Sequence, residues 1–374
     1  MAEESNSKLM IVVVGLLGAL IISSIAVSGG FTDTFEGSEE RFVVFPTYAA
    51  IGEDGSLTVP LRAWVFEPEK DSIRRNMFVD ALREFVDLDD AEQKRIFEAR
   101  VRPFLVDNER GKQVVAHLDD QRWILGESAP HGHVTKTVDI PADVASKVLG
   151  DDSDGGILEM RFTADFGGEQ SLEIPVVGRK GVSVVSDIDD TIKITEVLDR
   201  EAMLRRTFAR EFAHVEGMPA LFSRLKATYD PAFHYLSASP WQLHESLDPW
   251  LERAGYPDGP LHLRRLRPIN PASIHDFVRG SRSHKISTLE RLLDHHPERT
   301  FILIGDSGEH DPEVYGDIAR KYPDRIDNIL IRKVPDAKNG EERFEKAFEN
   351  IPAAKWRAFS EPDDVLPTEE FEEN

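Results

Sequence analysis

The hydrophobic pattern of the chain changes near Gly181, and this change limits the possible folds more than any other feature. From there, short apolar segments with the length of buried strands alternate with longer amphipathic segments. Such alternation predicts an α/β domain over residues 180–335, with a parallel sheet covered by helices on both faces. We expect its strands at residues 182–185, 234–236, 301–304 and 328–331, and its helices within residues 196–228, 241–254, 286–295 and 314–321.

Residues 31–179 show a different pattern. Apolar residues alternate with polar ones over 57–65, as in a half-buried strand, and Asp-Gly and Gly-Gly pairs mark turns. The segment therefore predicts a β-rich, sandwich-like accessory domain, in which we find no catalytic group. We expect further strands at residues 42–45, 101–106, 114–118, 133–140, 157–166 and 171–177, and helices at residues 71–84 and 91–100.

The first 30 residues predict a membrane segment. Residues 9–27 run for 19 positions without a charge, close to the roughly 20 apolar residues that cross a bilayer as a helix. An uncleaved transmembrane anchor is the preferred interpretation, and a secretory signal cleaved near Ala26 and Ser28 is the alternative. Because the nearest base, Lys8, lies on the N-terminal side, we expect a single-pass protein with an extracytoplasmic catalytic part, or a secreted one.

Charge and composition exclude several classes of protein. The net charge is −23, so nucleic acid is not an expected partner, because its phosphates require Lys and Arg. The chain has no cysteine, which excludes disulfides, thiolate metal sites and cysteine nucleophiles. Residues 336–374 are predicted to hold a last helix and an acidic tail, with seven acids and no base from residue 361 onward.

Carboxylates gather at the end of the first strand of the α/β domain. Asp187, Asp189 and Asp190 follow the apolar residues 182–185 within a few positions. Acids so close together repel one another unless a cation neutralises them. Mg²⁺ is the natural candidate, because it takes oxygen ligands and keeps waters that a phosphate can replace.

Polar side chains also follow the other strands. Ser237 and Ser239 come after residues 234–236, and Asp306, with Asp311 beyond it, comes after residues 301–304. Lys285 opens a predicted helix between these two strands. Since ligands bind at the carboxyl ends of parallel strands, we expect these groups to converge there.

This order resembles the four motifs of the haloacid dehalogenase superfamily. The Asp-x-Asp-x-Thr motif matches Asp187, Asp189 and Thr191, and the Ser or Thr motif matches Ser237. The lysine motif matches Lys285, and the acidic motif matches Asp306 and Asp311.

The resemblance implies Mg²⁺-dependent phosphoryl transfer. Asp187 would attack phosphorus and form an aspartyl-phosphate, and Asp189 would act first as acid and then as base. The metal would bind Asp187, the backbone carbonyl of Asp189, and Asp306. Ser237 and Lys285 would hold the phosphoryl oxygens. Asp311 would support the site by orienting Lys285 or the waters of the metal, and an acid at position 189 favours a phosphatase over a pump.

Three longer stretches show a narrower resemblance. They are residues 186–193, 235–243 and 305–315, and they resemble the phosphatidate phosphatase catalytic-domain family typified by the yeast actin-patch enzyme. This resemblance covers about residues 180–335 and implies hydrolysis of phosphatidate to diacylglycerol and phosphate. It also places Ser239, Arg279 and Arg282 at the substrate.

Charge supports an anionic substrate, although other readings stay open. Residues 261–285 carry six bases and one acid. This basic segment is consistent with a binding site for a phospholipid headgroup and, equally, with a surface patch whose charges are paired in salt bridges. No long insertion follows Thr191 or Ser239, so we expect an open site. The alternatives are a phosphatase for soluble phosphomonoesters or phosphoproteins, and an inactive membrane-tethered binding module. Protein partners are not identified by the sequence.

Overall fold

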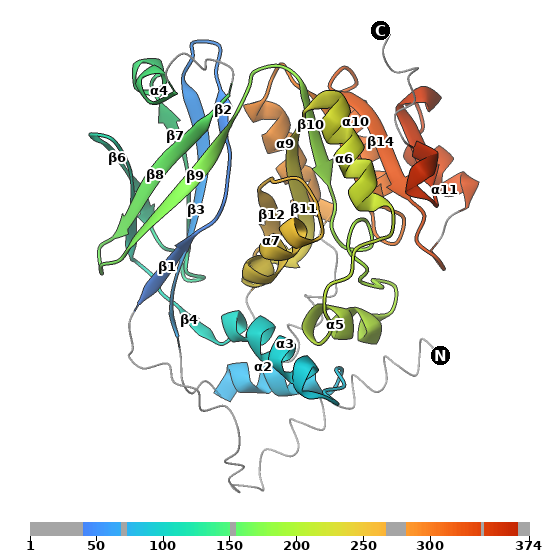
Figure 1. The fold of residues 1–374 in the computed structure, drawn as a ribbon, viewed down its shortest axis with the longest axis horizontal. Helices are drawn as coiled ribbons and strands as arrows, with labels where there is room; N and C mark the ends of the chain where they lie inside the picture. Colours follow the sequence, from blue (N-terminus) through green and yellow to red (C-terminus); the bar gives the residue numbers. More distant parts are fainter. Residues whose placement is uncertain (1–39, 69–72, 150–154, 267–281, 338–339, 366–374) are drawn as a thin grey trace, which may run out of the picture.

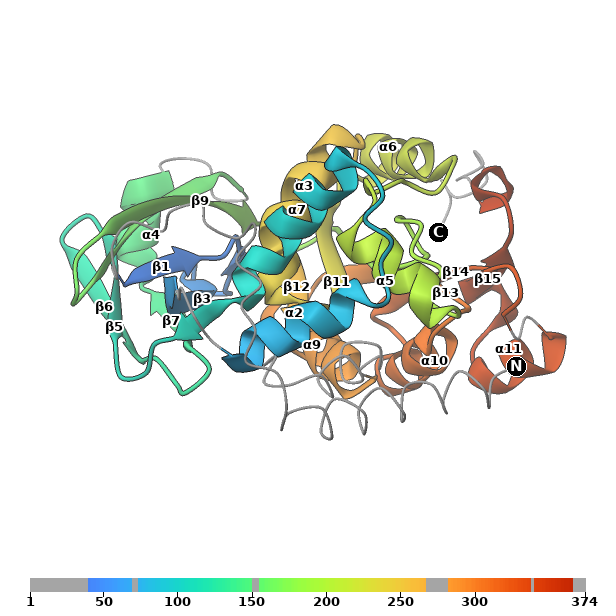
Figure 2. The ribbon, with the colours of Figure 1, turned by 90° about the horizontal axis from the view of Figure 1, so that it is seen from below.

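The computed structural model describes residues 40–68, 73–149, 155–266, 282–337 and 340–365. Figures 1 and 2 show a β-rich part, formed by the N-terminal half of the chain, beside an α/β part. The predicted membrane segment within residues 1–30 lies outside the described residues. Among the helices in those ranges, none combines the length and the apolar character needed to cross a bilayer.

The β-rich part is a sheet of nine strands that folds over one apolar core. Its strands follow the order β1-β3-β2-β9-β8-β5-β6, and β4 and β7 also pair with β3. The predicted β-rich character of this region is thus confirmed, and one helix, α4 (Ala142–Leu149), packs on β8. The strands are β1 (Arg41–Val44), β2 (Ala49–Ile51), β3 (Leu57–Pro68), β4 (Val106–Asn108), β5 (Gln113–Leu118), β6 (Gln121–Glu127), β7 (His133–Ile140), β8 (Ile157–Ala164) and β9 (Glu169–Val177).

Strand β3 shows how the sequence pattern builds this part. Its odd-numbered apolar residues, such as Leu57 and Val59, are buried in the core of the β-rich part. Successive side chains of a strand point to opposite faces, so the even-numbered residues face the other way. Trp64 on that second face belongs to the apolar cluster of the α/β part, and β3 therefore joins the two parts.

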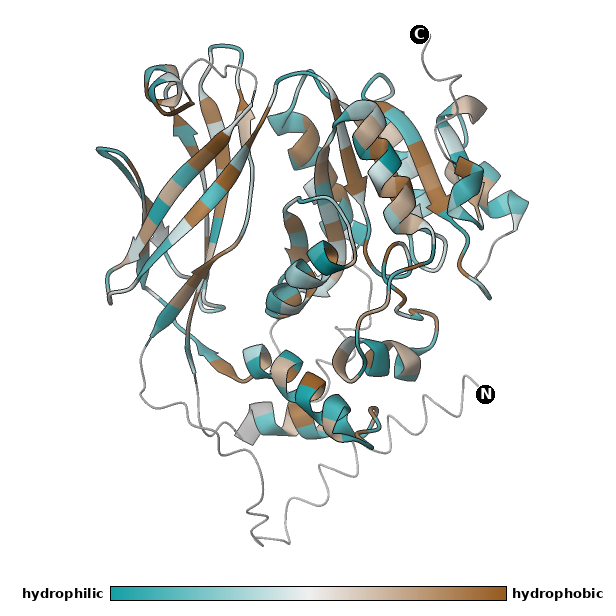
Figure 3. Ribbon diagram, in the orientation of Figure 1, coloured by the Kyte–Doolittle hydropathy of each residue, from teal (hydrophilic) through white to brown (hydrophobic). Residues whose placement is uncertain are grey.

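The α/β part contains the predicted parallel sheet. Its order is β12-β11-β10-β13-β14-β15, and every neighbouring pair is parallel. Figure 3 shows hydrophobic residues along its strands β10 and β14. The strands are β10 (Val182–Ser186), β11 (Ala232–Pro240), β12 (Leu261–Arg264), β13 (Thr300–Asp306), β14 (Ile326–Arg332) and β15 (Trp356–Phe359), and the helices are α5 (Arg200–Phe208), α6 (Met218–Tyr229), α7 (His244–Arg253), α9 (Arg282–His295), α10 (Asp311–Lys321) and α11 (Glu341–Ala347).

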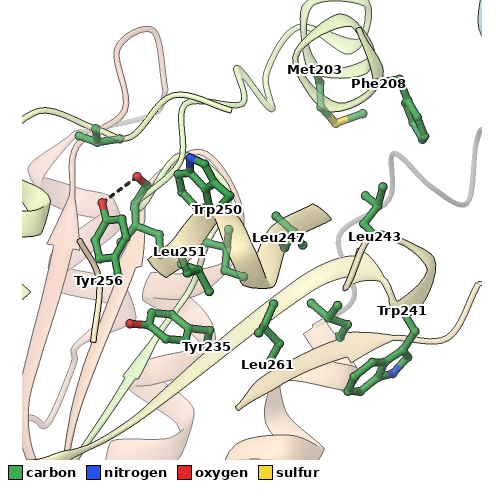
Figure 4. Packing of buried hydrophobic residues seen from close by; sticks show 14 of the residues in the cluster. Met203, Phe208, Tyr235, Trp241, Leu243, Leu247, Trp250, Leu251, Tyr256 and Leu261 are labelled. Atoms are coloured by element: carbon green, nitrogen blue, oxygen red, sulfur yellow. Dashed lines mark hydrogen bonds between the residues drawn. The ribbon is translucent and has the colours of Figure 1, made fainter. Parts of the chain in front are cut away.

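Each face of this sheet is covered by helices. Val184 of β10 packs in the cluster that includes α6 and α7, whereas its neighbour Val185 packs in the cluster that includes α9 and α10. Burial on both faces explains the continuous apolar character of the parallel strands. Figure 4 shows one of these faces, with side chains of α7 above those of the sheet. At one side of this view the Tyr256 hydroxyl donates to the carbonyl of Ile192 at 3.0 Å.

Two helices from the β-rich half of the sequence belong to the core of the α/β part. α2 (Ile73–Arg83) and α3 (Ala91–Val101) leave the β-rich part between β3 and β4 and lie beside α5 in Figures 1 and 2. Phe78 and Phe104 pack in the same cluster as Phe208 of α5. Residues 31–179 are therefore not wholly an accessory unit, because this insertion covers the α/β part.

One buried arginine fastens this insertion to α5. The guanidinium of Arg100 donates to the carbonyl oxygens of Thr207 at 2.8 Å and Arg210 at 2.6 Å. Cζ of this guanidinium lies 3.5 Å from the centre of the Phe212 ring. The C-terminal carbonyls of a helix lack intrahelical partners, so Arg100 satisfies groups that burial would otherwise leave unpaired.

We expect Arg100→Met to lower the free energy of unfolding by about 2–4 kcal/mol, because it leaves buried carbonyls without donors. Urea unfolding of the full chain, followed by circular dichroism, measures the change. Arg95→Met on the same helix is the matched control, because Arg95 is exposed and its loss should leave the midpoint unchanged. Equal midpoints for Arg100→Met and the wild type would show that α3 is not held by this contact.

Buried histidines line the contact between the two parts. His244 packs 5.1 Å from Phe45 and 6.1 Å from Trp241, measured between ring centres. Burial lowers the pKa of His244 to about 4, whereas a histidine in the unfolded chain titrates near 6.5. The unfolded chain therefore takes up the proton first, so stability is full above about pH 6.5 and decreases as the pH falls toward 4.

We expect His244→Phe to reduce the pH dependence of unfolding by about 1 kcal/mol per pH unit between pH 6 and 4.5. Phenylalanine keeps the ring in the apolar contact and removes the titrating group. Urea unfolding at several pH values gives the slope, and His310→Phe at an exposed position is the control. An unchanged slope in His244→Phe would mean that this ring does not titrate differently in the two states.

Several features of the fold differ from the sequence-based expectations. Strands β2 and β6 and helix α4 were not predicted. The expected strand at residues 101–106 is wrong: α3 continues to Val101, a 3-10 turn follows over Arg102–Phe104, and β4 begins at Val106. Val101 and Phe104 are both buried at a spacing of three, which is a helical period. Strands β12 and β15 were missed, because four residues are too few to show a clear alternation.

Candidate active site

The carboxylate of Asp187 lies at the carboxyl end of the central strand and is completely buried. Its backbone amide donates to the carbonyl of Ile304 at 2.8 Å, which continues the pairing of β10 with β13 beyond the last strand residue. One carboxylate oxygen lies 2.7 Å from Nζ of Lys285, and the other accepts from the Thr191 hydroxyl at 3.1 Å. The contact with Lys285 is an ion pair, and Oδ1 of Asp187 is buried without a hydrogen-bond partner.

Asp189 lies in a separate polar pocket next to this carboxylate. One of its oxygens lies 2.8 Å from Nζ of Lys193, and the other accepts from Ser237 at 2.8 Å and Ser239 at 3.0 Å. Burial alone would raise the pKa of Asp189. The charge of Lys193 and the hydrogen bonds that Asp189 accepts from Lys193, Ser237 and Thr195 lower this pKa to about 2. Asp189 is therefore ionised when no substrate is bound.

Asp190, the third acid in this segment, stabilises the loop that follows it. Asp190 has a φ of 57°, a left-handed conformation that Asp tolerates better than most residues. Its carboxylate accepts from the backbone amides of Thr195, Glu196 and Val197 at 2.6–2.8 Å. The loop that carries Lys193 and Thr195 is thus folded back beside Asp189.

Lys285 holds several carboxylates together from the first turn of α9. Its ammonium, buried with the residue 2% exposed, contacts Asp187 at 2.7 Å, Asp311 at 2.5 Å and Glu309 at 3.3 Å. Burial alone would lower the pKa of Lys285, but these carboxylates raise it well above its usual value. The lysine therefore stays protonated and is central to the electrostatic balance of the site.

The carboxyl end of β13 supplies two more acids. Asp306 accepts from the backbone amides of Gly308 and Glu309 through one oxygen, and Asp311 accepts from the backbone amide of Asp306 at 3.2 Å. Gly305 permits this approach, since a Cβ there would lie 2.4 Å from the Asp311 carboxylate. Arg343 of α11 stabilises the loop after β13, because it donates to the carbonyl oxygens of Ser307 and Glu309.

The acids fit a divalent cation. Carboxylate oxygens of Asp187, Asp306 and Asp311 lie within 4.8 Å of one another, and Oδ2 of Asp306 is buried without a hydrogen-bond partner. Burial, and then the charges of Asp311 and Asp187, raise the pKa of Asp306 well above its usual value. The single positive charge of Lys285 does not balance the negative charges of these carboxylates. Carboxylate oxygens are ligands of the kind that Mg²⁺ prefers.

Comparison with known proteins agrees with this geometry. Residues 182–333 match the model of a family described as "Phosphatidate phosphatase APP1, catalytic domain". Residues 182–333 are thus similar to the catalytic domain of the APP1 phosphatidate phosphatases. The matched segment begins at the first residue of β10 and ends one residue after β14, so it contains every site residue described above except Arg343.

Two curated relatives also match this chain. "Phosphatidate phosphatase APP1" of Saccharomyces cerevisiae is 36% identical over 155 residues, which is 41% of this chain and 26% of that protein. An uncharacterised protein of Schizosaccharomyces pombe is 32% identical over 166 residues, 43% of this chain and 27% of the relative. The chain thus spans about a quarter of their lengths. This similarity supports the predicted class, a phosphoric monoester hydrolase.

The structure brings together most of the predicted site residues of the phosphatase domain. Six of them meet at the carboxylates of Asp187 and Asp189: these two acids with Thr191, Ser237, Ser239 and Lys285. Asp306 and Asp311 complete the group. The Asp189 side chain is not part of the acidic cluster. The atom of Asp189 that is predicted to bind the metal is its backbone carbonyl oxygen. The catalytic and metal-binding roles of these residues stay predictions.

The two predicted substrate arginines are not placed at the site. Arg282 is half exposed and forms an ion pair with Asp317 of α10, and Arg279 lies outside the described residues. Sequence reasoning also missed Lys193, Thr195 and Glu309. A signal existed for Lys193: a lysine two residues after Thr191, in a segment otherwise rich in acids and apolar residues, is a natural counter-ion.

Proposed function

We propose that this chain is a Mg²⁺-dependent phosphatase that works through an aspartyl-phosphate on Asp187, with phosphatidate as its substrate. One observation carries the mechanism: a buried Asp187 carboxylate at the end of the central strand, held by Lys285 and Thr191 beside Asp306 and Asp311. The similarity to the phosphatidate phosphatase catalytic domain supports the proposed substrate class. Mg²⁺ would be held by Asp187, Asp306 and the carbonyl of Asp189, and would offset the negative charge shared by nucleophile and phosphate.

Asp187 supplies the nucleophilic oxygen. An oxygen of its carboxylate attacks phosphorus while the bond from phosphorus to the lipid oxygen breaks, which leaves a diacylglycerol alkoxide and a phosphorylated Asp187. Lys285, 2.7 Å from this carboxylate, donates to the phosphoryl oxygens and keeps the nucleophile in place. Water then attacks the phosphoryl group, releases phosphate and restores the carboxylate.

Asp189 acts as the general acid and then as the general base. Its pKa of about 2 depends partly on the hydrogen bond from Ser237, and Ser239 donates to the same carboxylate oxygen. We expect both hydroxyls to donate to a bound phosphoryl group instead. When a phosphate binds these hydroxyls, Asp189 loses donors and gains a negative neighbour, and both changes raise its pKa. Asp189 then takes up a proton from the solvent, transfers it to the departing alkoxide and afterwards accepts the proton of the hydrolytic water.

We also propose that residues 1–30 anchor the chain in a membrane and that the catalytic part is extracytoplasmic. The support is the charge-free run of 19 residues after Lys8. A tethered catalytic part would meet a phospholipid at the surface in which it resides. Cleavage of the same segment, which would release the protein, is the alternative.

The deciding experiment measures phosphate release by the full chain in detergent micelles. It compares phosphatidate with a soluble aryl phosphate, each with Mg²⁺ and with EDTA. We expect Mg²⁺-dependent release with a clear preference for phosphatidate. A preference for the aryl phosphate would keep the chemistry and replace the substrate, whereas folded protein without activity on either would remove the proposal.

A further inference from the structure

A cavity of about 400 Å³ lies where the β-rich part meets the phosphatase domain. Strands β3 and β7 line it on one side, and β12 and α9 line it on the other. Its wall adjoins the catalytic residues in sequence, because Trp241 follows Ser239 by two positions and His284 precedes Lys285. A volume of this size suits a small ligand or a lipid headgroup.

The charged side chains that line this cavity are all positive. They are Arg62 and Lys136 from the β-rich part, and Arg265 and Arg291 from the phosphatase domain. In the part of the chain that the structure describes, none of these four cations forms an ion pair with a carboxylate. Like charges that converge in a protein of net charge −23 repel one another unless an anion offsets them.

Arg62 shows the repulsion most directly. It projects from the face of β3 that is turned toward the phosphatase domain, with its guanidinium 5.0 Å from the Trp241 ring. Nη1 of this guanidinium is shielded from water and has no hydrogen-bond partner. Burial, followed by the charges of Arg265 and Arg291, lowers the pKa of Arg62 to about 10. Its guanidinium therefore has donors and charge that no neighbouring group satisfies.

Neutral polar side chains complete the lining. They are Thr47, Ser287, Thr288 and His284; the hydroxyls of Thr47 and Ser287 donate to backbone carbonyl oxygens, and that of Thr288 accepts from Arg291 at 3.4 Å. Burial lowers the pKa of His284 to about 4, so this ring is neutral at physiological pH. Guanidinium groups with hydroxyls around them, and no carboxylate, form an environment that selects tetrahedral oxyanions with several acceptor oxygens.

We propose that this cavity binds a phosphate group, separate from the catalytic phosphate, and that the bound group bridges Arg62 of the β-rich part to Arg291 of the phosphatase domain. The ligand is a free phosphate or the headgroup of an anionic phospholipid, which present the same oxygens. Binding does not depend on catalysis by Asp187, and the bridge would tie the orientation of the two parts to the presence of this anion.

Calorimetric titration of the full chain with inorganic phosphate, in detergent and EDTA, tests the binding. We expect Arg62→Gln and Arg291→Gln each to weaken phosphate binding at this site by about tenfold or more, the scale of a lost charge-assisted hydrogen bond. Arg224→Gln, at an exposed position on α6, should leave the affinity unchanged. Near-ultraviolet circular dichroism identifies any variant that fails to fold, and Arg291→Lys, which keeps the charge, should bind with intermediate affinity.

A second arm identifies the source of the phosphate. The same variants are sedimented with phosphatidylcholine vesicles, with and without phosphatidate. Loss of phosphatidate-dependent binding in Arg62→Gln assigns the site to a headgroup, and a loss in the calorimetric arm alone assigns it to soluble phosphate. Wild-type affinity of the folded Arg62→Gln and Arg291→Gln chains in both arms would overturn the proposal. Neither arm measures turnover, so the result is independent of the proposed phosphatase activity.

Discussion

The Asp187→Asn chain is expected to release phosphate roughly 10³-fold or more slowly than the wild type, the scale seen when a nucleophile is removed from a catalytic unit. Asparagine has nearly the same shape and still accepts from Thr191, but its neutral amide oxygen does not form a stable phosphoryl intermediate. Phosphate release under saturating substrate measures the loss. Rapid acid quenching with labelled substrate should trap a phosphorylated protein only in the wild type.

Stability separates this effect from misfolding. Asp187 is buried beside Asp306 and Asp311, so removal of its charge relieves repulsion, and we expect Asp187→Asn to unfold in EDTA at an equal or higher urea concentration. Asp327→Asn, at an exposed position on β14, is the matched control and should keep full activity. Activity of Asp187→Asn within tenfold of the wild type would rule out Asp187 as the nucleophile.

The Lys285→Met chain is expected to lose both activity and stability. The ammonium of Lys285 contacts Asp187, Asp311 and Glu309, and its removal leaves these buried carboxylates without their cation. Breaking a buried ion pair from one side typically costs about 3–5 kcal/mol. Urea unfolding should show a loss of this order in EDTA, and phosphate release should fall at least roughly 10²-fold because a phosphoryl contact is lost.

Mg²⁺ provides a further readout for this variant. A divalent cation at the acidic cluster would replace part of the missing positive charge, so Mg²⁺ should raise the unfolding midpoint of Lys285→Met more than that of the wild type. Lys321→Met removes an exposed lysine of α10 and should change neither measurement. If Lys285→Met were as stable as the wild type in EDTA, the carboxylates would have to be protonated in the folded protein.

The sequence predicts the α/β part well because its strands are buried on both faces. Continuous apolar runs such as residues 301–304 leave few other interpretations, and β13 indeed lies beside β10 in the parallel sheet. Short edge strands such as β12 and β15 lacked this signal. The position of α2 and α3 is not visible in the sequence either, since an amphipathic helix shows that it has an apolar face but not which surface that face covers.

The site could be predicted where the chemistry requires several residue types at the ends of successive strands. Asp187, Ser237, Lys285 and Asp306 converge because parallel strands share one active edge. The neighbours that tune them were harder to find. Lys193 and Thr195 reach Asp189 only through the loop that Asp190 closes. The expectation of an open site stays a prediction.

The insertion of α2 and α3 between β3 and β4 has a consequence for inheritance. A recombination event that joined the phosphatase domain to a new N-terminal partner near Gly181 would leave the apolar side chains of α5 without Phe78 and Phe104. The incoming partner would expose hydrophobic surface unless it brought an equivalent helical pair. We therefore expect the two parts of this chain to be gained, lost and duplicated together as one genetic unit.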